Sequence, residues 1–381
     1  MSRMRRGLVA AAAAAMLTLP ALPPARALAS TKAASTKAAS TKAASTKAAS
    51  TKAADTQAAG TFASNTLLFD SDDTAAGNYE IFAGTTSGGP MKQLTNDPTY
   101  DSMWPRISPD NQMVLFERTP KGDHDTTLTS ASVWTMHIDG SGLTQIISPN
   151  EYGWTYLWHP EWSPDGTHLV MLAGATQATS NITITDSAGN DPRDLLPPSG
   201  TPGAGTSWDP SWSVDGQWIV FVGCYGLVDG DGLCPLAFGS QVYKVHPDGT
   251  NLTRLSDDPY PDFDPYMSPD GTKVAFIEAK TGTDSAVEYS LALVGGDGGD
   301  LGYVIDDGGA NSRAGWASDS ATIYFHRRPL TSTGTSFGVW RISDDGAGLT
   351  QLYPAPATSA LGSLLDSSSY SFEYPAVVWP T

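Results

Sequence analysis

Short apolar runs alternate with turn signals along this chain, and one pattern of this kind recurs through most of it. The clearest copy covers residues 264–276, where the letters DPYMSPDGTKVAF give an extended segment, a turn and an apolar strand. In the turn, Pro presets φ, Asp forms local hydrogen bonds and Gly allows a left-handed backbone. The pattern therefore predicts a β-hairpin.

Further copies of this hairpin follow one another at a period of about 50 residues and read WPRISPDNQMVLF, HPEWSPDGTHLVM, DPSWSVDGQWIVF and RAGWASDSATIYF. A second hairpin accompanies each copy and is clearest in VWTMHIDGSGLTQI, VYKVHPDGTNLTRL and VWRISDDGAGLTQL. In its first strand, large apolar residues two positions apart fall on one face. Paired hairpins at this period indicate the blades of a β-propeller.

The two ends of the repeat region complement each other. The segment YPAVVW at 374–379 resembles the inner strand of the hairpin without its partner, and NTLLFD at 65–70 resembles the partner without its inner strand. Joining them in one blade leaves no open sheet edge. We therefore expect an all-β fold, a six-bladed β-propeller of four-stranded blades over residues 61–381, closed by pairing the N- and C-terminal strands.

The first 60 residues have a different composition. Residues 1–29 combine Arg3, Arg5 and Arg6 with an apolar run and then small residues, which is typical of a secretory signal peptide. Residues 30–60 repeat the unit STKAA and contain no large apolar side chain, so we expect a disordered linker. The mature protein is expected to be extracytoplasmic: secreted, periplasmic or associated with the cell wall.

The Ser-Pro-Asp-Gly turns, together with the Asp-Gly and Leu-Thr pairs of the second hairpin, resemble the TolB-type propeller repeat, a relative of the WD repeat. The resemblance covers nearly all of residues 61–381. Proteins of the TolB type also carry an α/β domain ahead of the propeller, and only the signal and linker stand in that place here. The resemblance implies a propeller scaffold for recognition.

Charge narrows the choice of partners. From Thr61 onward the chain has 13 basic and 39 acidic residues, a net charge of −26. Such a surface repels nucleic acid and anionic membranes, so neutral or cationic protein, peptide or glycan ligands are favoured. Part of the excess has a structural reason, because many of the aspartates belong to Asp-Gly turns. A monomer without a membrane span is expected.

Catalytic motifs give little support for an enzyme. Residues 334–338 match Gly-x-Ser-x-Gly, but a strand follows where that motif needs a helix. The histidines show no metal-binding spacing, and no Gly-Lys-Ser/Thr phosphate loop occurs. We therefore expect no catalytic residue, no cofactor and no metal.

The segment between Cys224 and Cys234 contains Asp229-Gly-Asp-Gly, which resembles half of a calcium loop. Leu233 and Cys234 stand where further oxygen ligands would be needed, so no calcium site is expected there. The two cysteines are the only ones in an exported chain, and we expect them to form a disulfide.

Aromatic and acidic residues are concentrated just before the inner strands, whose beginnings should ring one mouth of the channel. At roughly equivalent positions we expect a ring of ligand-binding residues formed by Trp158, His159, Asp209, Asp264, Arg313 and Tyr374. Aromatic faces with carboxylates between them suit a sugar, a cationic side chain or a peptide end. In the structural alternative, the aromatic residues pack between blades and the two aspartates cap turns.

Two functions follow from this ring. The first is a non-catalytic binding or scaffold module that recognises a neutral or cationic ligand at the mouth, and the absence of catalytic spacing favours it. The alternative is a glycan- or peptide-active enzyme that uses the mouth carboxylates with His159. Convergence of His159 with two carboxylates of perturbed pKa would discriminate between the two.

Overall fold

The computed structural model describes residues 65–71, 77–123, 130–176, 180–196, 206–225, 240–281, 287–328, 338–353 and 372–373. The predicted signal peptide and linker lie outside this part of the chain. Regular structure in the described part is almost all β-strand, as predicted, and its one helix is the short 3-10 turn η1 (Glu151–Gly153). No helix among the described residues is long and apolar enough to cross a membrane.

The strands form antiparallel sheets in chain order. Four sheets hold four strands each. In sheet order they are β24 (Phe372–Glu373), β1 (Thr66–Ser71), β2 (Glu80–Thr85) and β3 (Lys92–Gln93); β4 (Tyr100–Ile107), β5 (Met113–Pro120), β6 (Ser132–His137) and β7 (Thr144–Ile147); β8 (Tyr156–Trp162), β9 (His168–Gly174), β10 (Asn181–Asp186) and β11 (Arg193–Asp194); and β12 (Thr206–Trp212), β13 (Ile219–Cys224), β14 (Gln241–Val245) and β15 (Thr253–Arg254).

A larger, eight-stranded sheet completes the set. It consists of two antiparallel halves: β16 (Asp262–Met267), β17 (Lys273–Thr281), β18 (Val287–Gly295) and β19 (Asp300–Ile305), then β20 (Ala310–Trp316), β21 (Thr322–Arg328), β22 (Gly338–Ser343) and β23 (Thr350–Tyr353). Among the described residues, the strand pairing that joins the halves is the parallel pair Tyr289 and Ala310. Each half therefore has the strand order of one of the smaller sheets.

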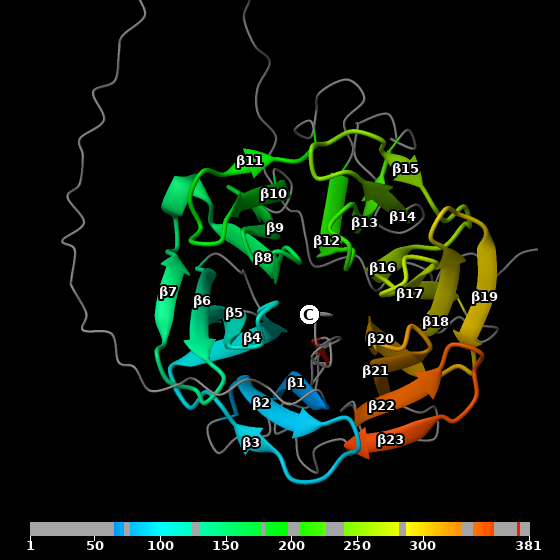
Figure 1. Cartoon of the computed structure of the whole chain (residues 1–381), viewed down its shortest axis with the longest axis horizontal. Coiled ribbons are helices and arrows are strands. Elements are labelled where there is room, and N and C mark those ends of the chain that lie inside the picture. Colours follow the sequence, from blue (N-terminus) through cyan, green and yellow to red (C-terminus); the bar gives the residue numbers. More distant parts are fainter. Residues whose placement is uncertain are drawn as a thin grey trace, which may run out of the picture. The chain divides into compact units, whose positions relative to one another are not determined.

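The sheets lie around a common centre (Figure 1). Strands β4, β8, β12, β16 and β20 lie nearest the centre, and β3, β7, β11, β15, β19 and β23 lie at the periphery. This is the arrangement of a β-propeller, so the predicted fold class is confirmed at that level. Strand β1 pairs with β24 through Leu68–Glu373 and Phe69–Phe372. The predicted closing strand at 374–379 lies outside the described residues.

The hairpin turns between the two innermost strands explain the repeated motif. Ser163 Oγ accepts the amide of His168 at 2.9 Å and donates to Asp165 at 2.6 Å. The same serine bonds recur in the turns at Ser108, Ser213 and Ser268. The left-handed turn position is glycine in three copies, whereas Asn111 and Ser320 adopt it with φ of 59° and 55° in the other two. This accounts for the degenerate copies in the sequence.

Hydrophobic cores lie between successive sheets. The apolar residue eight positions after each turn serine or its equivalent is at most 3% exposed, in the set Phe116, Met171, Phe221, Phe276 and Phe325. Phe325, for example, packs with Ile277 and Leu291 of the neighbouring half-sheet. Burial of each such side chain contributes roughly 1.5–3 kcal/mol to folding. Packing between neighbours thus sets the angular positions of the innermost strands.

Candidate functional site

A left-handed residue interrupts each of the innermost strands β4, β8, β12, β16 and β20. These residues have φ between 48° and 53° and are Trp104, His159, Asp209, Asp264 and Arg313. At each one the pairing register with the next strand shifts, which marks a β-bulge. A bulge turns one side chain out of the normal alternation of a strand. Four of the predicted residues, His159, Asp209, Asp264 and Arg313, therefore occupy equivalent positions, within the strands rather than in segments that lead into them.

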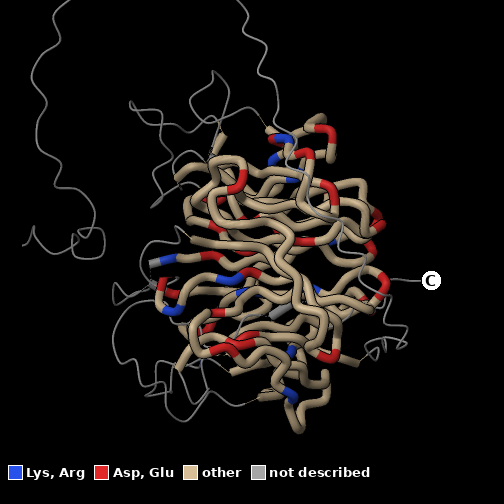
Figure 2. Tube along the Cα trace, turned by 90° about the vertical axis from the view of Figure 1, so that its left-hand side faces the viewer, with Lys and Arg blue, Asp and Glu red and all other residues tan. Residues whose placement is uncertain are grey.

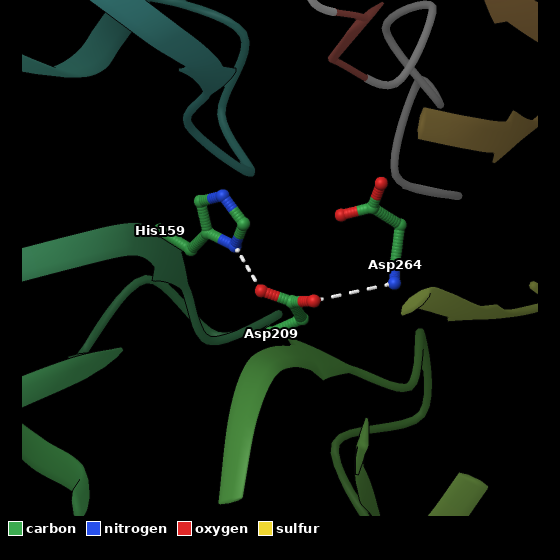
Figure 3. Close-up of side chains that lie close together, drawn as sticks. All are labelled: His159, Asp209 and Asp264. Atoms are coloured by element: carbon green, nitrogen blue, oxygen red, sulfur yellow. Dashed lines mark hydrogen bonds and ion pairs between the residues drawn. The ribbon is translucent and has the colours of Figure 1, made fainter. Parts of the chain in front are cut away.

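His159, Asp209 and Asp264 face one another (Figure 3). Nδ1 of His159 lies 2.9 Å from Oδ1 of Asp209, and the backbone amide of Asp264 donates to Oδ2 of the same carboxylate at 3.4 Å. The amide of Arg313 in turn donates to the Asp264 carboxylate. Each side chain is thus held by the bulge residue of the next sheet.

Trp104 completes this set, although the sequence prediction did not include it. Its indole ring lies 4.7 Å from the His159 ring in an edge-on arrangement. On its other side, the guanidinium carbon of Arg313 lies 5.2 Å from the Trp104 ring centroid, within cation–π distance. We call these residues the central ring: Trp104, His159, Asp209, Asp264 and Arg313. Contacts therefore run around the ring without interruption.

A second layer of side chains comes two residues later in the same strands. Nε of Arg106 in β4 lies 3.5 Å from Oε2 of Glu161 in β8, and its guanidinium also hydrogen-bonds the hydroxyl of Tyr266 in β16. Strands β4 and β16 belong to sheets with two other sheets between them (Figure 1), so Arg106 reaches across the centre. Burial raises the pKa of Glu161 to about 7, while the Arg106 charge acts in the opposite direction. These contacts link strands β4, β8 and β16 two residues beyond the ring.

Both ring carboxylates have shifted pKa values. Burial raises the pKa of Asp209 to about 6, although the Asp264 amide and the Arg313 charge lower it. Burial and then the charge of Asp209 raise the pKa of Asp264 to about 6, against the effects of His159 and Arg313. Both groups therefore change charge just below neutral pH. Convergence of His159 with two carboxylates of raised pKa is the arrangement that an enzyme would need, so it keeps the enzyme alternative open beside the binding module.

The turn-capping alternative for the two aspartates is wrong. Ser213 and Asp215 organise the turn after Asp209, and Ser268 with Asp270 organise the one after Asp264. For Trp158 the structural alternative holds in part, because its ring lies 4.7 Å from Trp104 and packs in a cluster with Tyr79 and Met103. Trp158 therefore supports the ring from the side.

Two predicted features fall wholly or partly outside the described residues. Tyr374 is one, so its place in the ring stays a prediction. Cys224 is buried at the end of β13, whereas Cys234 lies outside the described part, and their disulfide also stays a prediction.

Among the described residues, two groups have the composition and spacing to hold a metal ion: His159, Asp209 and Asp264, and the carboxylates of Asp258, Asp262 and Glu278. Within each group, one ligand atom per residue lies within 4.8 Å of the others. In the first group the carboxylates already have partners: the His159 imidazole and the Asp264 amide contact Asp209, and the Arg313 amide donates to Asp264. In the second group, Oδ1 of Asp262 is buried and no donor among the described residues contacts it.

Comparison with known proteins supports the fold. No protein-family model matches the chain. It is similar to the protein TolB homolog of Chlorobium luteolum, with 29% identity over 150 residues that cover 39% of this chain and 29% of that protein. The match thus spans less than a third of that relative's length.

Two solved structures are similar over most of this chain. Putative TolB from Agrobacterium tumefaciens gives a TM-score of 0.54 at 17% identity and covers 76% of this chain and 88% of that one. TolB from Acinetobacter baumannii gives 0.59 at 14% identity, with 81% and 67% covered. At these identities the likeness concerns the fold alone. The part of the chain that the structure describes is a TolB-like β-propeller.

Proposed function

We propose that this protein is an exported, non-catalytic recognition module that binds a neutral or cationic peptide, protein or glycan ligand at the central ring. The observation that carries the proposal is the continuous set of contacts in the central ring, which places His159, Asp209 and Asp264 from three different innermost strands beside an aromatic face and a guanidinium. Recognition at a propeller centre uses side chains from several sheets, which no single loop could bring together.

The chemistry of the central ring matches the class of ligand. Well above pH 6, Asp209 and Asp264 are both ionised, so the ring places two carboxylates beside the one guanidinium of Arg313. The Trp104 face beside them suits an ammonium group or the apolar face of a sugar. Acidic residues outnumber basic ones in the rest of the domain (Figure 2), and this net negative charge attracts the same class of ligand and repels polyanions.

The same proposal covers the number of propeller blades and the export of the protein. We infer a six-bladed propeller in which residues 374–379 supply the inner strand of the sheet that begins with β1, preceded by a signal peptide at 1–29 and a linker at 30–60. The two residue pairs between β1 and β24 support this closure, because β24 ends directly before residue 374. The N-terminal composition supports export.

A glycan and peptide array tests the proposal. Wild-type protein should select a small set of neutral or cationic probes, and Asp209→Asn combined with Asp264→Asn should lose them. The matched control is Asp139→Asn with Asp191→Asn, which removes the same charge from exposed peripheral turns. Equal binding by the ring variant would place the ligand elsewhere on the protein.

An enzyme remains the second candidate, because His159 converges with two carboxylates whose pKa is raised to about 6. Groups that titrate near the working pH are suited to general acid–base catalysis. Incubating the array ligands with wild-type protein and analysing the products by mass spectrometry separates the two functions. A recognition module returns the ligands intact, whereas cleavage that disappears in the ring variant would establish the enzyme.

A further inference from the structure

A second cluster of carboxylates lies where β16 begins. Asp258 is in the connection from β15, Asp262 is the first residue of β16, and Glu278 lies opposite it in β17. Asp262 is fully buried and Glu278 is 4% exposed. Acidic groups this close together repel one another strongly when water is excluded.

The β4–β5 pair shows what the same position holds in another sheet. Ser102 and Arg118 correspond there to Asp262 and Glu278, two positions before the left-handed residue of the innermost strand. Nε of Arg118 donates to Ser102 Oγ at 3.2 Å, and Nη2 lies 3.2 Å from Oδ2 of Asp97. A guanidinium thus lies between a neutral side chain and a loop carboxylate.

The β20–β21 pair repeats this arrangement. Arg327 donates from Nη1 to Oδ1 of its partner Asn311 at 2.8 Å, and its Nη2 forms an ion pair with Asp307. The loop carboxylates correspond as well, because Asp97, Asp258 and Asp307 each accept the amide of the residue two positions later. The loop geometry is therefore shared by all three sites.

In β16–β17 the cation of this arrangement has been replaced. Glu278 stands where the other pairs have arginine, Asp262 stands where they have serine or asparagine, and the loop carboxylate Asp258 is retained. The other two pairs have one guanidinium, one neutral side chain and one loop carboxylate at this place, whereas β16–β17 has three carboxylates. A position built around a cation elsewhere in the fold is here surrounded by anionic ligands.

The hydrogen bonds of Asp262 also indicate a site for a cation. Its Oδ2 accepts the Val242 amide at 3.2 Å and the Ser256 hydroxyl at 2.5 Å. Its Oδ1 is buried, and no donor among the described residues contacts it. A buried carboxylate oxygen without a partner is costly, so this atom needs a proton or a cation.

The nearest basic side chains are already paired with other carboxylates. Arg254 forms an ion pair with Asp257, and Lys280 forms one with Asp306. Their charges still act on the cluster, since Arg254 lowers the pKa of Asp258 and Lys280 lowers that of Glu278.

The pKa values of Asp258 and Glu278 are nevertheless raised, because other effects are larger than those of Arg254 and Lys280. Burial is the largest cause that raises the pKa of all three cluster carboxyls, and charge repulsion between Asp258 and each of the other two adds to it. The acidic Asp300 nearby raises the pKa of Asp258 and Glu278 further. Hydrogen bonds from Tyr260, Ser256 and Tyr303 lower the pKa of Asp258, Asp262 and Glu278 respectively, but the pKa of each carboxyl is still raised, so these protein groups do not offset burial and mutual repulsion.

We infer that Asp258, Asp262 and Glu278 bind a divalent cation, with Ca²⁺ the best match, at the position that a guanidinium takes in the β4–β5 and β20–β21 pairs. An all-oxygen, carboxylate-rich site selects a hard cation over Zn²⁺ or Cu²⁺. Two strands and a loop provide an irregular geometry, which Ca²⁺ accepts more readily than Mg²⁺. The inference is independent of the proposed function, because none of its ligands belongs to the central ring.

Calcium and terbium titrations of chelator-treated, full-length protein test this site. Calcium chloride should raise Tm by several degrees, because the ion binds the folded state alone. The Tyr303 hydroxyl donates to Oε1 of Glu278, so bound Tb³⁺ should show tyrosine-sensitised luminescence that Ca²⁺ displaces. Glu278→Gln should raise the Kd for both ions at least tenfold.

A grafted variant gives the sharpest comparison. Asp262→Asn with Glu278→Arg reproduces the charges of the β20–β21 pair, so its Tm should match or exceed that of calcium-free wild type and should not respond to calcium. The ring variant Asp209→Asn/Asp264→Asn should keep the full calcium response. The inference is overturned if wild type shows no response to either ion, if the response survives in the grafted and Glu278→Gln variants, or if only the ring variant loses it.

Discussion

At the scale of single residues, one backbone conformation decides what lies at the centre of this propeller. Trp104, His159, Asp209, Asp264 and Arg313 all have φ near 50°. For a residue with a Cβ atom this conformation costs on the order of 1 kcal/mol. The cost recurs at each innermost strand, and the side chains it redirects form the ring. Strain is therefore concentrated where the protein presents its most reactive groups.

The raised pKa values of Asp209 and Asp264 predict a specific dependence of stability on pH. Between about 3.8 and about 6 the folded state binds more protons at these sites than the unfolded state does. Their contribution to the free energy of unfolding is therefore full below this window and is lost as pH rises through it. Asp209→Asn with Asp264→Asn should lose less stability between pH 4 and pH 7 than wild type does.

Urea unfolding at several pH values measures this difference. The Asp139→Asn/Asp191→Asn variant is the control. Hydrogen bonds from Ser141 lower the pKa of Asp139, so its protonation changes below this window, and the variant should follow the wild-type slope from about pH 5 to pH 7. Parallel curves for wild type and the ring variant would mean that neither carboxylate is destabilised by burial.

Most residues of the central ring were predictable from the sequence, and Trp104 was the one omitted. His159, Asp209 and Asp264 were found because each occupies the same register before a hairpin turn. Trp104 occupies that register too, and each of these four residues directly precedes a proline. The dipeptides WP, HP, DP and DP were therefore a signal for the whole set. The bulge itself was not predictable, because it depends on the pairing of each strand with its neighbour.

At the scale of elements, the glycine of the second hairpin has a role that spacing alone did not reveal. In the β14–β15 turn, Gly249 has φ of +84°, and a Cβ placed on it would lie 2.7 Å from the Leu195 carbonyl of the preceding sheet. Similar close approaches occur at Gly140 to Leu94 and at Gly88 to Leu352. The second hairpins therefore dock onto the neighbouring sheet through their turns, which explains why these turns contain glycine.

This docking predicts different costs for two glycine substitutions. Gly271 in the β16–β17 turn has φ of +73° with no atom within 4 Å of a built Cβ. Gly271→Ala should cost about 1 kcal/mol from backbone strain alone. Gly249→Ala should cost roughly 1–3 kcal/mol more, because the two sheets must also separate. Chemical denaturation of both variants checks the order, and equal losses would contradict docking through this turn.

The hairpins themselves were predictable because Pro, Asp, Ser and Gly fix turn geometry locally. The peripheral strands were less predictable. Strands β3, β11 and β15 have two residues each, and the turn before each strand determines its pairing. The carboxylate cluster of β16–β17 was missed because its members are separated by an entire hairpin. Only the strand pairing brings Glu278 beside Asp262.

At the scale of the whole molecule, strand pairing joins the two ends of the described chain. Strand β1 lies between β2 and β24, so it has partners on both sides. A propeller whose first sheet lost its C-terminal strand would expose the edge of β1, which contains the fully buried residues Leu67, Leu68 and Phe69. Stability of the whole domain is therefore linked to residues far apart in sequence.

Deletion of residues 374–381 should accordingly lower Tm sharply and unfold the domain in one cooperative step. Removal of residues 30–60 is the control and should leave Tm within error, because that segment has no large apolar side chain to bury. Thermal melting followed by circular dichroism measures both. An unchanged Tm after the C-terminal deletion would contradict closure by this segment.

The most direct measurement of the central claim is isothermal titration of the strongest array ligand into wild type, the Asp209→Asn/Asp264→Asn variant and the Asp139→Asn/Asp191→Asn control at pH 8. Loss of two charge-assisted contacts at the ring should weaken binding roughly a hundredfold, about 2.7 kcal/mol, while the control stays within about twofold of wild type. Equal affinity in all three proteins, with the ring variant folded, would contradict recognition at the centre of the propeller.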